Sequence, residues 1–127
     1  MAQLAAIGIV TRDTAESCRF YRTLGLDVPE PPADGDHFDV TLPNGLRLMW
    51  DTETLMKQLD PDWERPQGQG MGLAFECADA ADVDKTYARL LEAGFRGKKE
   101  AYDAFWGQRY ATVIDPDGSA VDLFAPL

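Results

Sequence analysis

Residues 4–28 read LAAIGIVTRDTAESCRFYRTLGLDV, and residues 71–95 read MGLAFECADAADVDKTYARLLEAGF. Each stretch starts with an apolar segment, passes an aspartate (Asp13 or Asp79), continues with apolar residues at helical spacing and reaches a glycine. This order predicts a strand, a helix and a glycine that ends the helix, twice in one chain, and the first helix is expected to be capped by Thr14 or Asp13. Two similar modules predict a pseudo-symmetric domain, and a cleft where the halves meet is a natural ligand site.

Further strands follow each predicted helix. Residues 37–42 alternate between apolar and polar, and Pro43-Asn44-Gly45 is a turn signal that leads into a returning strand over residues 46–51. Residues 26–28 also predict the start of a strand, which is broken by Pro29, Pro31 and Pro32.

The second half repeats this plan. Strands are expected at residues 95–102, 110–114 and 120–124, and Asp115-Pro116-Asp117-Gly118 is a turn between the last two. The order β-α-β-β-β therefore occurs twice, which predicts an α+β fold with mostly antiparallel strands and with helices on one face.

The length of 127 residues predicts one domain over residues 1–127, with modules at about 1–60 and 68–127. A linker of about residues 52–70 contains several prolines and glycines, and we expect a short helix within it at residues 54–59. Trp63 in this linker either pins it to the body of the protein or closes a dimer.

Composition excludes several classes of function. The net charge of −10 argues against binding nucleic acid or anionic membranes, and it suits a cationic ligand, although acidity can also serve solubility alone. No apolar run is long enough to span a bilayer and no signal peptide is apparent, so a cytoplasmic protein is expected. Cys18 and Cys77 then read as reduced, buried thiols.

Two elements carry a resemblance to a known family. Phe20-Tyr21 followed by Leu24-Gly25-Leu26 resembles its first module, and Trp106-Gly107-x-Arg109 followed by Asp115-Pro116-Asp117-Gly118 and Val121-Asp122-Leu123 resembles the end of its second. The family is the vicinal oxygen chelate superfamily, which includes glyoxalase I, extradiol dioxygenases, and fosfomycin- and bleomycin-resistance proteins. The resemblance implies two βαβββ modules whose sheets curl around a cleft, commonly completed across a homodimer.

Enzymes of this family hold a divalent metal with His, Glu or Gln side chains from strands of both modules. The corresponding positions are Ala6 and Gly72 in the first strands, Leu48 or Met49 in the returning strand, with Asp51 just beyond, and Asp122 in the last strand. Because so few of these can act as ligands, we expect no metal and no cofactor. The chain is closest in character to the metal-free antibiotic-binding proteins of the family.

A ligand site is expected to combine aromatic and charged side chains. Flat rings stack on planar ligands and attract cations, and carboxylates neutralise a basic ligand. The predicted ligand-binding residues are Trp106, Trp50, Tyr102, Tyr110, Phe38, Asp103, Arg109, Asp51 and Asp122. No catalytic residue is assigned among them.

Several of these residues have a second interpretation. Trp50 can instead pack against the other surface of its sheet, and Arg109 can pair with an acid on a neighbouring strand. His37 reads as a surface strand residue. Trp106 is the strongest candidate for ligand contact because a loop aromatic precedes Gly107.

Two classes of function remain from the sequence. The first is a metal-independent small-molecule binder that sequesters a planar or cationic compound such as an antibiotic, and open sheet edges lead us to expect a homodimer. The second is a glyoxalase- or dioxygenase-like enzyme with an altered metal site around Asp122 and Asp51. A third, weaker possibility is a dimerising domain that regulates a partner.

Overall fold

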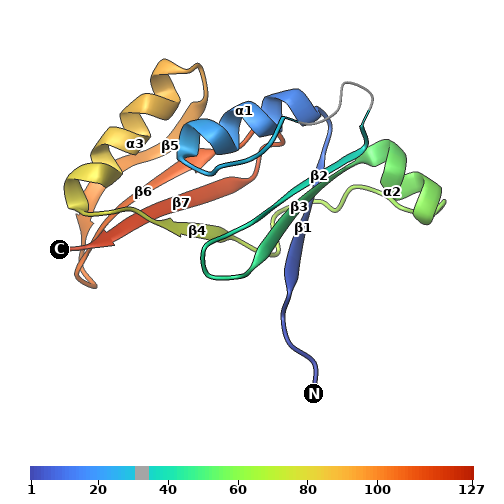
Figure 1. The fold of residues 1–127 in the computed structure, drawn as a ribbon. Coiled ribbons are helices and arrows are strands. Elements are labelled where there is room, and N and C mark those ends of the chain that lie inside the picture. Colours follow the sequence, from blue (N-terminus) through green and yellow to red (C-terminus); the bar gives the residue numbers. More distant parts are fainter. Residues whose placement is uncertain (31–34) are drawn as a thin grey trace. The chain divides into compact units, whose positions relative to one another are not determined.

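The protein is described by a computed structural model over residues 1–30 and 35–127. Over these residues it has three helices and seven strands in two mixed sheets, which confirms the predicted α+β fold (Figure 1). The chain forms two compact units. Unit 1 comprises Met1–Arg22 and Leu26–Arg65, and unit 2 comprises Thr23–Gly25 and Pro66–Leu127.

Unit 1 contains a three-stranded sheet. Its elements are β1 (Ala6–Thr11), α1 (Thr14–Leu24, whose last two residues belong to unit 2), β2 (His37–Thr41), β3 (Arg47–Thr52) and α2 (Glu53–Leu59). The strand order is β1-β3-β2, with β1 parallel and β2 antiparallel to β3. Asp13 caps α1 by accepting a 3.1 Å hydrogen bond from the Glu16 amide.

The hairpin between β2 and β3 forms at the predicted turn. The Asn44 side chain accepts a hydrogen bond of 3.0 Å from the Leu46 amide, and Gly45 has a φ of 89°, a conformation that favours glycine. The register of this hairpin pairs Phe38 with Trp50.

The strand expected at residues 26–28 is absent from the described part of unit 1. Val28 is buried, but its carbonyl accepts a 2.7 Å hydrogen bond from Arg22 Nε of α1. Pro29 offers no N–H to a sheet. This segment therefore binds to the helix, and the described unit 1 has βαββ order followed by α2, while Pro31 and Pro32 lie outside the described residues.

The segment after α2 is fixed by ion pairs. Glu53 Oε1 lies 2.7 Å from Arg65 Nη2 and 3.4 Å from Arg12 Nε, and the guanidinium of Arg65 lies over the Trp63 ring at 5.9 Å from its centroid. Through Arg65, these contacts join the segment to α2 and β1. Trp63 itself contacts Arg65 of the same segment, so its role as a pin or in a dimer stays a prediction.

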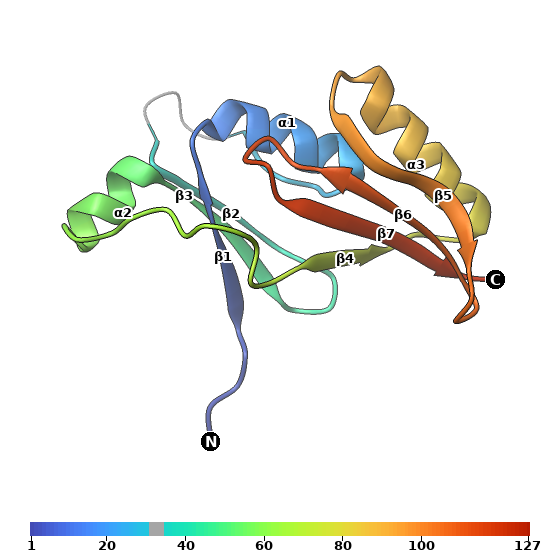
Figure 2. The same ribbon diagram turned by 180° about the vertical axis from the view of Figure 1, so that it is seen from behind.

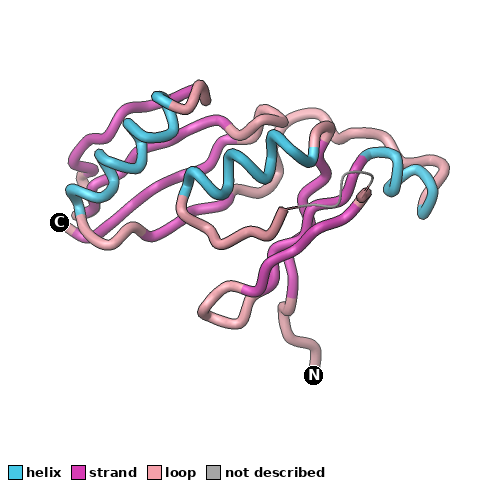
Figure 3. Tube along the Cα trace, turned by 45° about the horizontal axis from the view of Figure 1, so that its top comes forward, coloured by secondary structure: helices cyan, strands magenta, loops and turns pink. Residues whose placement is uncertain are grey.

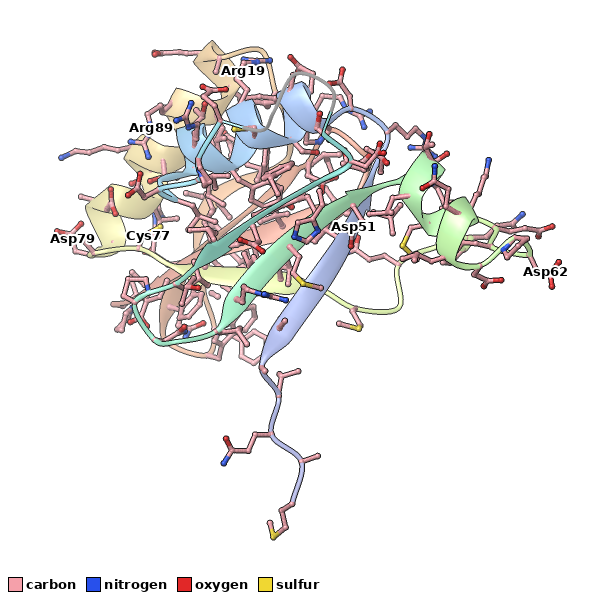
Figure 4. All side chains as sticks on the ribbon, turned by 45° about the vertical axis from the view of Figure 1, so that its right-hand side comes forward. Arg19, Asp51, Asp62, Cys77, Asp79 and Arg89 are labelled. Carbon is pink, nitrogen blue, oxygen red and sulfur yellow. The ribbon has the colours of Figure 1, made fainter. Side chains whose placement is uncertain are left out.

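Unit 2 has the complete module. It consists of β4 (Leu73–Glu76), α3 (Ala80–Glu92), β5 (Arg96–Ala104), β6 (Gln108–Ile114) and β7 (Ala120–Pro126), with strand order β4-β7-β6-β5 (Figure 2). Strand β4 runs parallel to β7, and the other pairs are antiparallel. Cys77 and Asp79 lie where β4 leads into α3 (Figure 4), and Asp79 caps that helix at 2.8 Å from the Asp82 amide.

The two faces of this sheet differ. Helix α3, cyan in Figure 3, packs along β5, β6 and β7. In the middle of β6 and β7, the residues on the helix side are apolar and buried, and they are Ala111, Val113, Val121, Leu123 and Ala125. Because side chains alternate along a strand, the intervening residues Tyr110, Thr112, Asp122 and Phe124 lie on the opposite face, where they are partly exposed. We call this second surface the open face of unit 2.

Within the described chain, no helix has the length and apolar character needed to cross a membrane.

Candidate functional site

An aromatic cluster occupies the open face of unit 2. The register aligns Tyr102 of β5 with Tyr110 of β6, and Tyr110 with Phe124 of β7. Ring centroids lie 6.4 Å apart in both pairs. Trp106 extends the cluster from the β5–β6 turn at 5.3 Å from Tyr110, and Phe105 lies 5.0 Å from Trp106. The term aromatic cluster refers below to Tyr102, Phe105, Trp106, Tyr110 and Phe124.

The outer part of this cluster is exposed. Phe105 is 97% exposed and Trp106 is 48% exposed. The turn that carries them is held by Gly107, whose φ is 91°, and by a 2.7 Å hydrogen bond from Trp106 Nε1 to Gln108 Oε1. The indole therefore has a defined orientation, and part of its surface is accessible to a ligand.

A fixed carboxylate lies beside the cluster. The hydroxyl of Tyr110 donates to Asp122 Oδ2 at 2.7 Å, and the hydroxyl of Thr112 donates to Asp122 Oδ1 at 2.8 Å. Burial, together with the hydrogen bond to Asp122 and its charge, raises the pKa of Tyr110 to about 12. The phenol thus stays protonated near neutral pH, and Asp122 provides an oriented acceptor at the edge of the rings.

Trp50 and Phe38 are buried inside unit 1. Their rings stack at 4.7 Å in unit 1, Trp50 also contacts Tyr21 of α1 at 5.0 Å, and the exposed fractions are 0% and 5%. They lie on the face of the sheet that packs against α1, which was the second interpretation of Trp50. Because their rings are enclosed by protein, we do not include either residue in the candidate site.

Arg109 and Asp103 also lie away from the cluster. Arg109 alternates with Tyr110 along β6, so its side chain leaves the sheet on the helix side. Its guanidinium pairs with Asp84 of α3 at 2.9 Å and with Asp103 at 3.0 Å, and these hydrogen bonds raise the pKa of Arg109. The pairing interpretation therefore describes Arg109, and both residues are excluded from the candidate site.

Asp51, which is labelled in Figure 4, belongs to unit 1. It pairs with His37, the only histidine of the chain. His37 Nδ1 lies 2.6 Å from Asp51 Oδ1, and His37 Nε2 lies 3.0 Å from Asp39 Oδ2. The hydrogen bonds to Asp51 and then Asp39 raise the pKa of His37. His37 is indeed a surface residue, and Asp51 acts as its partner.

The residues at the positions where enzymes of the family hold a metal offer few donors. Ala6 and Gly72 provide no side-chain ligand. One candidate position in β3 is Met49, which pairs with Gly8 of β1. The side chain of Gln69 lies beside Gly72 and is held by Ala120. Its Oε1 accepts from the Ala120 amide at 2.7 Å, and its Nε2 donates to the Ala120 carbonyl at 2.9 Å. Asp122 already accepts from two hydroxyls. No three His, Cys, Asp or Glu side chains in the described ranges gather as a metal site, so these residues do not fit such a metal.

Sequence reasoning missed three residues near the cluster. Phe124 and Thr112 share the strand parity of Asp122 and Tyr110, so alternation alone could have found them. Lys99 could not be found in this way. It is three residues from Tyr102, which in a regular strand means opposite faces, but the register shifts between Gly97 and Tyr102 place Lys99 opposite Thr112.

Comparison with known proteins agrees with this architecture. The sequence profile of the Glyoxalase/Bleomycin resistance protein/Dioxygenase superfamily matches residues 3–123. A comparison with curated protein sequences finds no match.

Solved structures share the fold. A glyoxalase/bleomycin resistance protein/dioxygenase family enzyme from Burkholderia phytofirmans PsJN is 19% identical, with a TM-score of 0.85 over 99% of this chain and 100% of that one. A glyoxalase-related enzyme from Fulvimarina pelagi is 22% identical, with a TM-score of 0.81 over 98% and 88%. A lactoylglutathione lyase from Agrobacterium tumefaciens is 16% identical, with a TM-score of 0.70 over 98% and 94%. By the profile match over nearly its whole length, the chain belongs to the Glyoxalase/Bleomycin resistance protein/Dioxygenase superfamily.

Proposed function

We propose that this protein is a metal-independent small-molecule binding protein of its superfamily, and that it sequesters a planar aromatic or cationic compound such as an antibiotic. The observation that carries the proposal is the aromatic cluster, in which contacting rings are partly exposed beside the fixed carboxylate of Asp122. Trp106 and Phe105 are exposed side by side, and adjacent exposed apolar side chains are typical of an interaction site rather than of a core.

The chemistry of the cluster suits such a ligand. Stacked or edge-to-face aromatic pairs contribute about 0.5–1.5 kcal/mol each beyond burial, so a flat ligand on two or three rings gains a useful affinity. Asp122 adds a negative charge at the edge of the rings. The two hydroxyl donors fix its orientation before a ligand arrives, which reduces the entropy that binding must lose.

We further propose a homodimer. In the described chain β1 and β4 each pair with only one neighbour, β3 and β7. Unpaired strand edges are commonly covered or paired in stable proteins, and a second copy is one way to cover them. Sedimentation equilibrium at micromolar concentrations tests this, and a monomer with full ligand affinity would contradict it.

The binding function is tested with protein treated with a chelator and dialysed. A thermal-shift screen of planar antibiotics and aromatic metabolites should identify compounds that raise the melting temperature, because a ligand that binds only the folded state stabilises it. Hits should quench Trp fluorescence and bind equally before and after chelation. Hits that disappear on chelation and return with a divalent metal would favour the enzyme class instead.

A further inference from the structure

One ring of the cluster already holds a cation. The ammonium nitrogen of Lys99 lies 4.0 Å from the ring centroid of Tyr102, well within the range of a cation–π contact. Trp106 and Tyr110 meet Tyr102 at interplanar angles of 89° and 64°, so neither ring stacks flat on it. A ring face of Tyr102 is thus available to a positive charge.

In so acidic a chain, Lys99 could form an ion pair with a carboxylate instead of contacting a ring. The protein carries 22 Asp and Glu residues, yet within residues 1–30 and 35–127 Lys99 forms no ion pair. Its side chain is exposed, and the irregular register of β5 places it in the same row as Thr112 and Asp122. The strand irregularity therefore brings this amine onto the open face of unit 2, next to the aromatic cluster.

We propose that the ring face of Tyr102 is a cation subsite, that Lys99 occupies it in the free protein, and that the ligand is a planar cation whose positive group replaces Lys99. The inference rests on the proposed binding function and narrows its ligand class. Asp122 supports it, because its negative charge favours a cation at the same rings. Glu76 adds a second acid on this face, in β4 opposite Phe124.

Replacement of Lys99 has a measurable consequence. The ammonium competes with a cationic ligand for Tyr102 and also repels it. Removing that charge should strengthen binding of a planar cation and should hardly affect a neutral compound of the same shape.

The test uses N-methylacridinium, a permanent planar cation, and acridine at mildly alkaline pH, where it is neutral. Titrations followed by Trp fluorescence compare the wild type with Lys99→Met, which keeps an unbranched side chain but removes the charge. Lys98→Met is the matched control, because it removes the same charge from the adjacent exposed residue. Lys99→Met should bind N-methylacridinium about three- to tenfold more tightly, while acridine changes by less than about twofold.

Two further variants identify the ring. Tyr102→Phe keeps the aromatic face and should keep the preference for the cation over acridine. Tyr102→Leu should lose that preference while remaining folded by circular dichroism. Loss of the preference in Tyr102→Phe as well would show that the hydroxyl, and not the ring face, is responsible, which overturns the subsite.

The outcomes separate the subsite from the binding function. If both dyes bind and Lys99→Met behaves like Lys98→Met, the cluster binds planar compounds and the cation subsite is wrong. If Lys99→Met weakens N-methylacridinium, Lys99 assists the ligand and the inference is also overturned. If neither dye binds any variant, the result contradicts the subsite together with the proposed binding function.

Discussion

The hydroxyl of Tyr110 donates a 2.7 Å hydrogen bond to Asp122, whose other oxygen accepts from Thr112. Both oxygens of the Asp122 carboxylate are thus engaged by the protein's own hydroxyls. This contact joins the aromatic cluster to Asp122, the acid of β7 on the open face. The pKa of Tyr110 reports on this contact.

The pKa of Tyr110 provides the first prediction. Ultraviolet titration of phenolate absorbance should show one tyrosine ionising near pH 12, above the ordinary value of 10.0. Asp122→Asn should lower that pKa without restoring the ordinary value, because burial is the largest cause and remains. Tyr110→Phe assigns the transition by removing it. A wild-type protein in which no tyrosine titrates above the ordinary range contradicts the contact.

The same shift has a consequence for stability. Since the folded-state pKa is raised, the contribution of the protonated phenol is fully present below pH 10.0 and is lost as the pH rises through about 12. The unfolding free energy of the wild type should therefore fall across this interval more steeply than that of Tyr110→Phe. Parallel curves for the two proteins would be the contrary result.

His37 should titrate above 6.5, the ordinary pKa of histidine, because Asp51 and Asp39 bond to its two ring nitrogens. The raised folded-state pKa stabilises the protein below pH 6.5, and this contribution is lost as the pH rises through the folded value. The single histidine gives one resolved NMR titration. Asp51→Asn should lower its pKa more than Asp39→Asn does, and the reverse order would show that the ring is held differently.

Gly97 lies against the phenol of Tyr87. A Cβ at residue 97 would lie 2.7 Å from Tyr87 Cζ and closer still to its hydroxyl. Gly97→Ala should therefore cost about 1–3 kcal/mol of unfolding free energy through overpacking. Gly70→Ala is the matched control because its Cβ would meet nothing within 4 Å, and Tyr87→Ala should reduce the cost of Gly97→Ala. Equal costs at the two glycines would contradict the packing described.

Arg109 tests which face of the sheet binds the ligand. Its partners Asp84 and Asp103 hold it on the helix side. Arg109→Met should leave the affinity for a planar ligand within about twofold of the wild type, since it removes no contact on the open face. An affinity loss comparable to that of an aromatic-cluster variant would return Arg109 to the ligand site.

Local patterns explain how much the sequence revealed. Helix caps, hairpin turns and strand periodicity depend on neighbouring residues, so they predicted most elements correctly. The cap expected at Thr14 or Asp13 is Asp13, and the turn at Asn44-Gly45 forms. The strand predicted at residues 26–28 does not form. The Val28 carbonyl accepts a hydrogen bond from Arg22, and periodicity does not reveal this contact.

The site was harder to predict, for a similar physical reason. Trp50 and Trp106 are equally aromatic in sequence, but in the structure Trp50 packs against Tyr21 and Phe38 and is buried, whereas Trp106 is half exposed. The irregular register of β5 also hid Lys99, because it breaks the alternation from which a face is inferred. Residue chemistry thus indicated an aromatic, acidic site, whereas membership of that site depended on tertiary structure.

The most direct test of the central claim is the affinity of Trp106→Ala for a planar ligand identified in the screen, measured by titration calorimetry on chelator-treated protein. Trp106→Ala should bind this ligand about ten- to a hundredfold more weakly than equally treated wild type, with unchanged circular dichroism, because stacking area is lost from an exposed cluster. Trp63→Phe, which changes an indole outside the cluster, should bind as the wild type does. Unchanged affinity in Trp106→Ala, or binding by the wild type that depends on a restored divalent metal, would contradict the claim.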